Sequence, residues 1–189
     1  MLRLALVLAA ALALAAGGPA CAAEEIDLKR VSLEAADEGY ALDADFVLEL
    51  NTRLDDALHS GVPLWFVVEF QLGRARWYWL DEKVVSKSLP LKLSYHALTR
   101  QYRVSSSGPL HQSYPTLGEA LRALGTIRGW TVLERGQLKP GDTYDAALRM
   151  RLDVTQMPKP FQVTAITNRD WNLASDWRRW RVTPNGGER

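Results

Sequence analysis

The residues whose types and spacing could do chemistry are concentrated in residues 74–83, which read RARWYWLDEK. In an extended strand alternate side chains share a face, so Trp77, Trp79 and Asp81 would lie on one face, with the two arginines and Tyr78 on the other. Paired indoles can stack on sugar rings or on a peptide, with Asp81 as their polar partner. In the competing structural interpretation, the indoles pack under a helix and the Arg–Tyr face forms a solvated cation–π ladder. The candidate binding residues are Arg74, Arg76, Trp77, Trp79 and Asp81.

A second cluster of arginine and tryptophan occupies residues 169–181, which read RDWNLASDWRRWR. Interleaved Arg and Trp side chains can stack on bases or hold anionic headgroups. The chain carries 23 Lys+Arg against 22 Asp+Glu, however, so it has no strong field to attract either ligand. We therefore interpret the cluster as structural, with Arg–Asp pairs and indoles closing one end of the fold, and we expect no nucleic-acid binding.

The remaining polar residues form no recognisable catalytic or metal-binding motif. His59, His96 and His111 lack the spacing of a metal motif, and the single cysteine excludes a disulfide framework or a cysteine zinc site. Adjacent carboxylates such as Asp55 and Asp56 would point to opposite faces of a strand, so no acid–base pair is ready-made. We expect no catalytic residue, no metal and no cofactor. A hydrolase whose carboxylates meet only in the folded protein is the alternative.

The first 23 residues have the three parts of a secretory signal peptide. Arg3 precedes an apolar run from Leu4 to Ala16, and small residues follow. The run has 13 residues, too few to span roughly 30 Å of hydrocarbon as a helix. We therefore expect export to the periplasm, with no membrane span after cleavage. Lipid attachment at Cys21 is the less favoured alternative, because Gly18 stands where a lipoprotein signal usually has an aliphatic residue.

Alternation of apolar and polar residues is the dominant pattern in the rest of the chain. Residues 40–50 and 142–154 place apolar side chains on one face and charged ones on the other, as in half-buried strands. A change of phase near Lys29 and Arg30 predicts a β-bulge in the first strand. With further strands at 65–72, 74–85, 91–95, 101–105, 161–167 and 177–183, we expect about nine strands. The pattern predicts a mainly β fold, an antiparallel β-sandwich.

One or two helices interrupt this pattern. Asn51 can cap a short helix over residues 52–59, and Thr116 with Glu119 has the spacing of a capping box for a helix reaching Arg128. Residues 157–160, MPKP, are expected to form a stiff extended connector between strands. No repeat or long linker divides the chain, so residues 24–189 are expected to form a single domain.

Several long segments resemble a family of exported proteobacterial proteins, the domain-of-unknown-function 4390 family (DUF 4390). The resemblance implies a cell-envelope protein of a Gram-negative bacterium, without an assigned activity, cofactor or catalytic residue. It also implies a signalling association, in which an envelope sensor kinase would be the partner. The segments that carry it are GVPLWFVVEF (61–70), RWYWLDEK (76–83), LSYHALTRQYRV (93–104), RMRLD (149–153), PKPFQV (158–163) and NRDWNLASDW (168–177).

The function expected from the sequence is therefore a periplasmic interaction or sensory module that catalyses no reaction. Its partner would be an envelope protein, with a sensor kinase as the candidate. The alternative from a different class is a glycan or small-ligand binder that uses Trp77 and Trp79 as a stacking platform.

Overall fold

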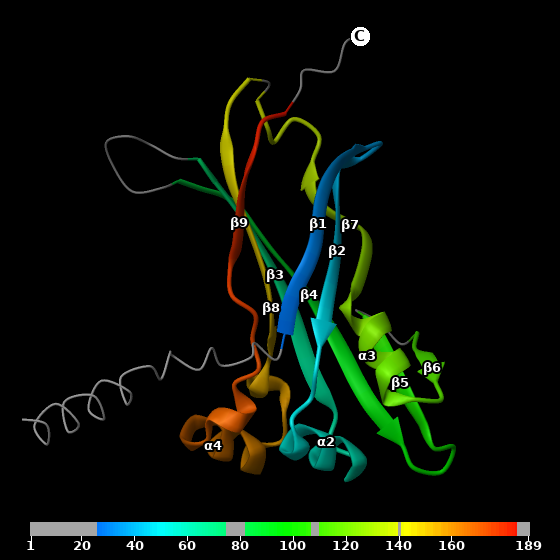
Figure 1. Cartoon of the computed structure of the whole chain (residues 1–189). Helices are drawn as coiled ribbons and strands as arrows, with labels where there is room; N and C mark the ends of the chain where they lie inside the picture. Colours follow the sequence, from blue (N-terminus) through cyan, green and yellow to red (C-terminus); the bar gives the residue numbers. More distant parts are fainter. Residues whose placement is uncertain (1–25, 75–81, 107–109, 140, 185–189) are drawn as a thin grey trace, which may run out of the picture.

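The fold is a sandwich of two antiparallel β-sheets with helices at its lower end (Figure 1). The computed structural model describes residues 26–74, 82–106, 110–139 and 141–184. Within these ranges there are nine strands, as the alternating pattern predicts. None of the described helices is both long and apolar enough to cross a membrane.

The small sheet has three strands in the order β1-β2-β7. The pairing of β1 with β2 shifts register between Leu28 and Arg30, which confirms the predicted bulge. At the start of β2, Gly39 adopts φ +146° and a Cβ there would lie 1.9 Å from the carbonyl oxygen of Leu133, so only glycine fits. The strands are β1 (Ile26–Ala36), β2 (Gly39–Leu48) and β7 (Thr126–Glu134).

The large sheet has six strands in the order β6-β5-β4-β3-β8-β9. Residues 82–85 of the strand predicted at 74–85 and the strand predicted at 91–95 belong to one long strand, β4, because its pairing with β3 continues without a turn between them. Arg74 is the last residue of β3, and residues 75–81 of that prediction lie outside the described residues. The strands β6 and β7 were not predicted. The members of the sheet are β3 (Leu64–Arg74), β4 (Glu82–His96), β5 (Gln101–Ser106), β6 (Gln112–Tyr114), β8 (Tyr144–Leu152) and β9 (Arg178–Val182).

Two helices begin at the predicted caps. The side chain of Asn51 accepts a hydrogen bond from the N–H of Leu54 (3.0 Å) at the start of α2 (Thr52–His59). At the start of α3 (Leu117–Gly125), the Thr116 hydroxyl accepts one from the N–H of Glu119 (3.3 Å). Helix α3 ends at residue 125 and not at 128, because the chain passes directly into β7, where pairing with β2 replaces the last helical turn.

The third helix corrects two predictions. Residues 161–167 were predicted as a strand and 157–160 as an extended connector, but α4 (Lys159–Thr167) covers all of the first segment and half of the second. Pro158 precedes α4 and Pro160 lies in its first turn, where a missing N–H costs nothing because that N–H has no helical partner. The 3-10 turns η2 (Val154–Gln156) and η3 (Arg169–Trp171) flank it. Proline therefore starts a helix here.

The core lies between the inner faces of the two sheets. Alternate residues of the central strands are buried, for example Phe66, Val68 and Phe70 on β3, and Leu42 and Phe46 on β2. Burial of such a side chain contributes about 1.5–3 kcal/mol. The alternation that predicts the strands therefore also supplies the packing that joins the sheets.

The last residue of α3, Gly125, lies so close to β2 that a larger side chain there should destabilise the protein. A Cβ on Gly125 would lie 2.2 Å from the carbonyl oxygen of Phe46, whereas one on Gly118, in the same helix, would meet nothing within 4 Å. We expect Gly125→Ala to lower the free energy of unfolding by about 1–3 kcal/mol, since the backbone of β2 must move. Gly118→Ala, the control, should raise it by up to about 1 kcal/mol. Urea denaturation followed by tryptophan fluorescence measures both. Equal stability of the two variants would show that α3 does not end against β2.

Candidate functional site

Of the five predicted binding residues, only Arg74 lies within the described part of the chain; residues 76, 77, 79 and 81 lie outside it. The Arg74 Nη2 lies 2.5 Å from the Asp142 carboxylate and donates to the Tyr144 hydroxyl (3.1 Å). Its guanidinium also lies 5.4 Å from the centroid of the Tyr144 ring. Arg74 therefore links the end of β3 to the start of β8, and its charge is already balanced within the protein. The tryptophan platform stays a prediction.

The second Arg–Trp cluster is structural in part, as expected. Trp171 is buried against Phe161, with ring centroids 5.6 Å apart, and Trp180 packs against Phe70 at 6.4 Å. The carboxylate of Asp170 lies 2.7 Å from Arg53 of α2. These contacts hold the turns around α4 against α2 and the inner face of the large sheet.

An ion-pair network lies on the outer face of the large sheet. Glu69 on β3 accepts from Arg149 (2.6 Å) and Arg151 (3.0 Å) on β8, and Arg151 also lies 3.5 Å from Asp153. Burial alone would raise the pKa of the Glu69 carboxyl, but the hydrogen bonds and charges of the two arginines together hold that pKa below its usual 4.5. Arg149 also lies over the Trp177 ring, 4.4 Å from its centroid.

A histidine joins α2 to the end of the large sheet. His59 Nδ1 lies 2.9 Å from the Asp55 carbonyl oxygen, so Nδ1 carries the proton and Nε2 accepts from the Tyr102 hydroxyl at 2.8 Å. Burial, with the charges of Asp55 and Tyr95, raises the pKa of Tyr102. The Asp55 carboxylate also lies 3.3 Å from His59 Nδ1, so Asp55, His59 and Tyr102 follow the acid–histidine–hydroxyl order of a nucleophilic triad. The raised pKa of Tyr102, however, disfavours the phenolate that a nucleophile needs. The arrangement therefore ties elements together.

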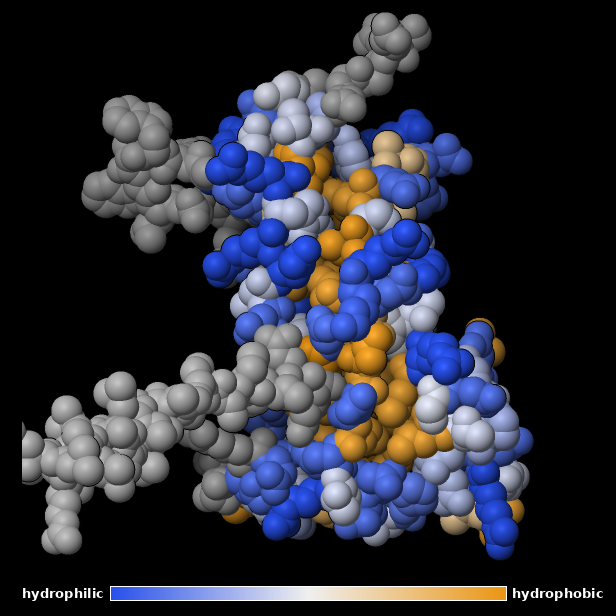
Figure 2. All heavy atoms as spheres, in the orientation of Figure 1, coloured by the Kyte–Doolittle hydropathy of each residue, from blue (hydrophilic) through white to orange (hydrophobic). Residues whose placement is uncertain are grey.

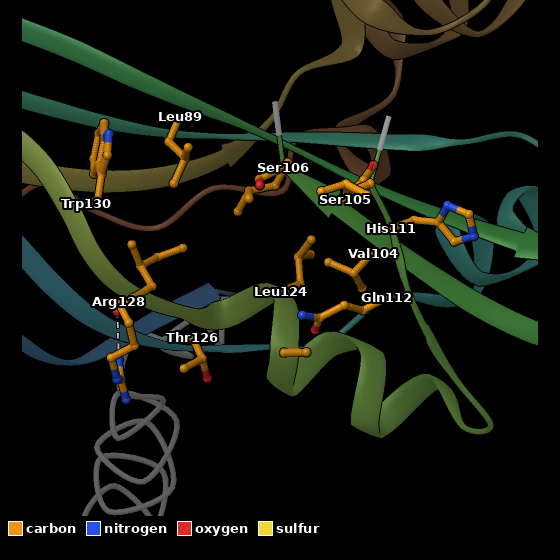
Figure 3. A pocket seen from close by; sticks show the side chains of 14 residues that line it. Leu89, Val104, Ser105, Ser106, His111, Gln112, Leu124, Thr126, Arg128 and Trp130 are labelled. Carbon is orange, nitrogen blue, oxygen red and sulfur yellow. Dashed lines mark hydrogen bonds between the residues drawn. The ribbon is translucent and has the colours of Figure 1, made fainter. Parts of the chain in front are cut away.

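A cavity among the described residues is a groove at one side of the sandwich, with a volume of about 400 Å³ (Figure 3). We call it the lateral groove. Buried Leu91, Leu124 and Ile127 form its apolar base, and in the view of Figure 3 Trp130 and His111 lie at opposite ends. The lining residues are Leu89, Leu91, Val104, Ser105, Ser106, Leu110, His111, Gln112, Ala123, Leu124, Thr126, Ile127, Arg128 and Trp130.

The groove forms where the large sheet becomes narrower. The last pair between β4 and β5 is Leu91 with Ser106, and the next residue of β4, Pro90, pairs only with Val67 of β3. Proline has no N–H for a second ladder, so the β4–β5 pairing ends beside it. Across the gap, β7 follows α3 directly and pairs only with β2. Among the described residues, no backbone ladder therefore joins β4 to β7, and side chains alone line the space between them.

The lining of the groove is apolar with a weakly basic border. Its ionisable residues are Arg128 and His111, and none of its lining residues is a carboxylate. Arg128 donates to Asp45 (2.5 Å) and to the carbonyl oxygens of Ala44 and Ile127 (3.1 and 2.7 Å). The paired carboxylates that a hydrolase would need are therefore not in this groove. Among the described residues, no group of three or more His, Cys, Asp or Glu could hold a metal ion.

Sequence reasoning missed the lateral groove because its residues come from five separate elements. One local signal was present: Ile127 and Trp130 lie in a β-branched and aromatic stretch that was assigned partly to a helix. Another was Leu110, an isolated apolar residue after a Ser-, Gly- and Pro-rich turn, which is 86% exposed.

The Glu69 network predicts a pH dependence of stability. Because the folded-state pKa is below the unfolded value, the carboxylate stabilises the protein above about pH 4.5, and this contribution is lost as the pH falls through the folded value. We expect Glu69→Gln to lower the free energy of unfolding by about 2 kcal/mol at pH 7, with a difference that shrinks below pH 4.5. Asp145→Asn, on the same face of the sheet, is the control. Urea denaturation between pH 3 and pH 7 measures both, and a difference independent of pH would refute this account.

Comparison with known proteins gives a family without an assigned function. No curated protein and no solved structure matches the chain. A family described as "Domain of unknown function (DUF4390)" matches residues 23–181, which include every described helix and nearly every described strand residue. The chain belongs to the DUF4390 family.

Proposed function

We propose that this protein is an exported interaction module that catalyses no reaction and holds an apolar segment of a partner protein in the lateral groove. The observation that carries the proposal is the groove itself, with an apolar base and an almost fully exposed leucine, Leu110, on its border. Exposed apolar side chains beside a concave surface are typical of binding sites.

The size and shape of the groove fit side chains of a larger partner. A volume of about 400 Å³ is within the range of ligand pockets, and the walls come from β4, β5 and β6 on one side and from α3 and β7 on the other. Burial of Leu110 on association would contribute about 1.5–3 kcal/mol, which is the size of an interface hot spot.

The polar residues of the groove indicate the kind of segment it accepts. Ser105, Ser106 and Gln112 supply hydroxyl and amide groups, and the ionisable lining residues are basic. A partner segment with apolar side chains and uncharged polar flanks would match this lining, because the charge of Arg128 is already paired with Asp45.

The location and identity of the partner rest on the sequence. The signal-peptide pattern of residues 1–23 supports a periplasmic location, and the family resemblance supports an envelope sensor kinase as the partner. The proposal is thus a periplasmic accessory to a signalling protein, with the lateral groove as its contact site.

A photo-crosslinking pair tests this proposal. A benzophenone amino acid replaces Leu110 at the groove or, as the control, Leu98 in the turn between β4 and β5, which is 92% exposed and does not line the groove. We expect position 110 to give a discrete adduct in intact cells that position 98 does not give. Mass spectrometry identifies the partner, and the proposal specifies an envelope protein.

A substitution then links that adduct to binding. Leu110→Asp should weaken binding of the identified partner to the purified protein by about tenfold, because an ionised group must be desolvated, and Leu98→Asp should leave the affinity unchanged. Identical crosslinking at positions 98 and 110, or equal affinities of the two aspartate variants, would count against the groove as the contact site.

A further inference from the structure

The second open side of the sandwich lies between the edge strands β1 and β9. Among the described residues, strand β1 pairs only with β2 and β9 only with β8, so no described ladder closes this side. Figure 2 shows an apolar band running along the molecule between two polar margins on this side. The half-buried side chains that contribute to it are Leu28, Val31 and Leu33 of β1 and Trp180 and Val182 of β9. We call this band the β1–β9 seam.

Cations from both strands meet at a small hollow in the seam. The hollow has a volume of about 250 Å³ and is lined by Leu28, Lys29, Arg30, Val31 and Arg178. Lys29 pairs with Asp27. Arg30 and Arg178 are exposed, and neither has an ion-pair partner among the described residues. Two like charges from opposite strands therefore border one hollow, beside the apolar side chains of Leu28 and Val31.

This juxtaposition points to an anionic ligand with an apolar chain. Guanidinium groups bind phosphate and carboxylate through two parallel hydrogen bonds, and an anion in the hollow that Arg30 and Arg178 both line could pair with either guanidinium. The neighbouring half-buried side chains of the seam would cover an alkyl chain, and each CH₂ group removed from water would strengthen binding. We propose that the β1–β9 seam binds an amphiphile, with its phosphate or carboxylate headgroup between Arg30 and Arg178 and its alkyl chain along the seam.

Charged residues on edge strands also have another established use, the prevention of strand addition by a second copy of the chain. That role requires charge on the edge but no apolar band beside it. The seam has both features, and the two roles give different experimental results. This site is separate from the lateral groove, so the proposal does not rest on the function proposed above.

The test uses dodecyl phosphate below its critical micelle concentration, titrated into the purified protein by calorimetry. Inorganic phosphate provides the headgroup alone, and dodecyl maltoside provides the same chain with an uncharged headgroup. We expect one molecule of dodecyl phosphate to bind, at least about tenfold more tightly than either comparison compound, because charge and chain act together.

Variants assign the binding to the seam. Arg178→Gln and Arg30→Gln should each weaken binding of dodecyl phosphate by about tenfold, as expected for loss of a charge-assisted hydrogen bond. Arg181→Gln is the matched control. Arg181 lies on the same strand as Arg178 but three residues away, so its side chain points to the opposite face of the sheet. Leu110→Asp should also leave this binding unchanged, which separates the seam from the lateral groove. Thermal unfolding checks that each variant is folded.

Three results would overturn the proposal. Equal binding of inorganic phosphate and dodecyl phosphate would show an anion site without a chain site. Unchanged affinity in both Arg30→Gln and Arg178→Gln would place the ligand elsewhere. A dimer of the unliganded protein in sedimentation, abolished by Arg178→Gln, would show that a second copy covers the seam.

Discussion

The two sheets of this protein are held together by the packing of their inner faces, with no strand shared between them. The sheets are also unequal, since three strands face six. A narrow sheet cannot cover a wide one, so the apolar inner face of the large sheet extends beyond the small sheet. Helix α3 packs against β4, β5 and β6 and covers part of the excess on one side, and the lateral groove is the part that it leaves open. Core packing therefore determines where the apolar openings are.

Local sequence features set the shape of these openings. Pro90 marks the point on β4 where pairing with β5 ends, and Gly125 lets α3 end in contact with the backbone of β2. Without this close approach, Leu124 could not lie at the base of the groove with Ile127, three residues later on β7. The groove thus depends on the direct passage from α3 to β7 at residues 125–126. This passage is set by the backbone and does not depend on which side chains line the groove.

The sequence predicts the sandwich well because half-buried strands such as β2 and β8 carry their burial pattern in every second residue. The bulge after Leu28 was predictable for the same reason, since it changes the phase of that pattern. Helix α4 was not, because Phe161 and Val163 also fit a strand, although Pro158 and Pro160 stand where a helix can begin and Phe161 packs against Trp171 in the fold. The lateral groove could not be predicted, because it depends on the pairing order of the strands, and alternation within a strand carries no information about its neighbours.

Each edge strand of the two sheets has a feature that hinders the addition of another strand. Strand β1 has a bulge, β7 shifts register twice against β2, β6 has only three residues, and three of the five residues of β9 are arginine. A partner that bound by extending either sheet would meet these features at every edge. The apolar openings between the sheets carry no such obstacle, because they present side chains and not an unpaired backbone. Recognition by this fold is therefore expected to proceed by insertion of apolar groups between the sheets, and the charges along each opening would select among the molecules that can do so.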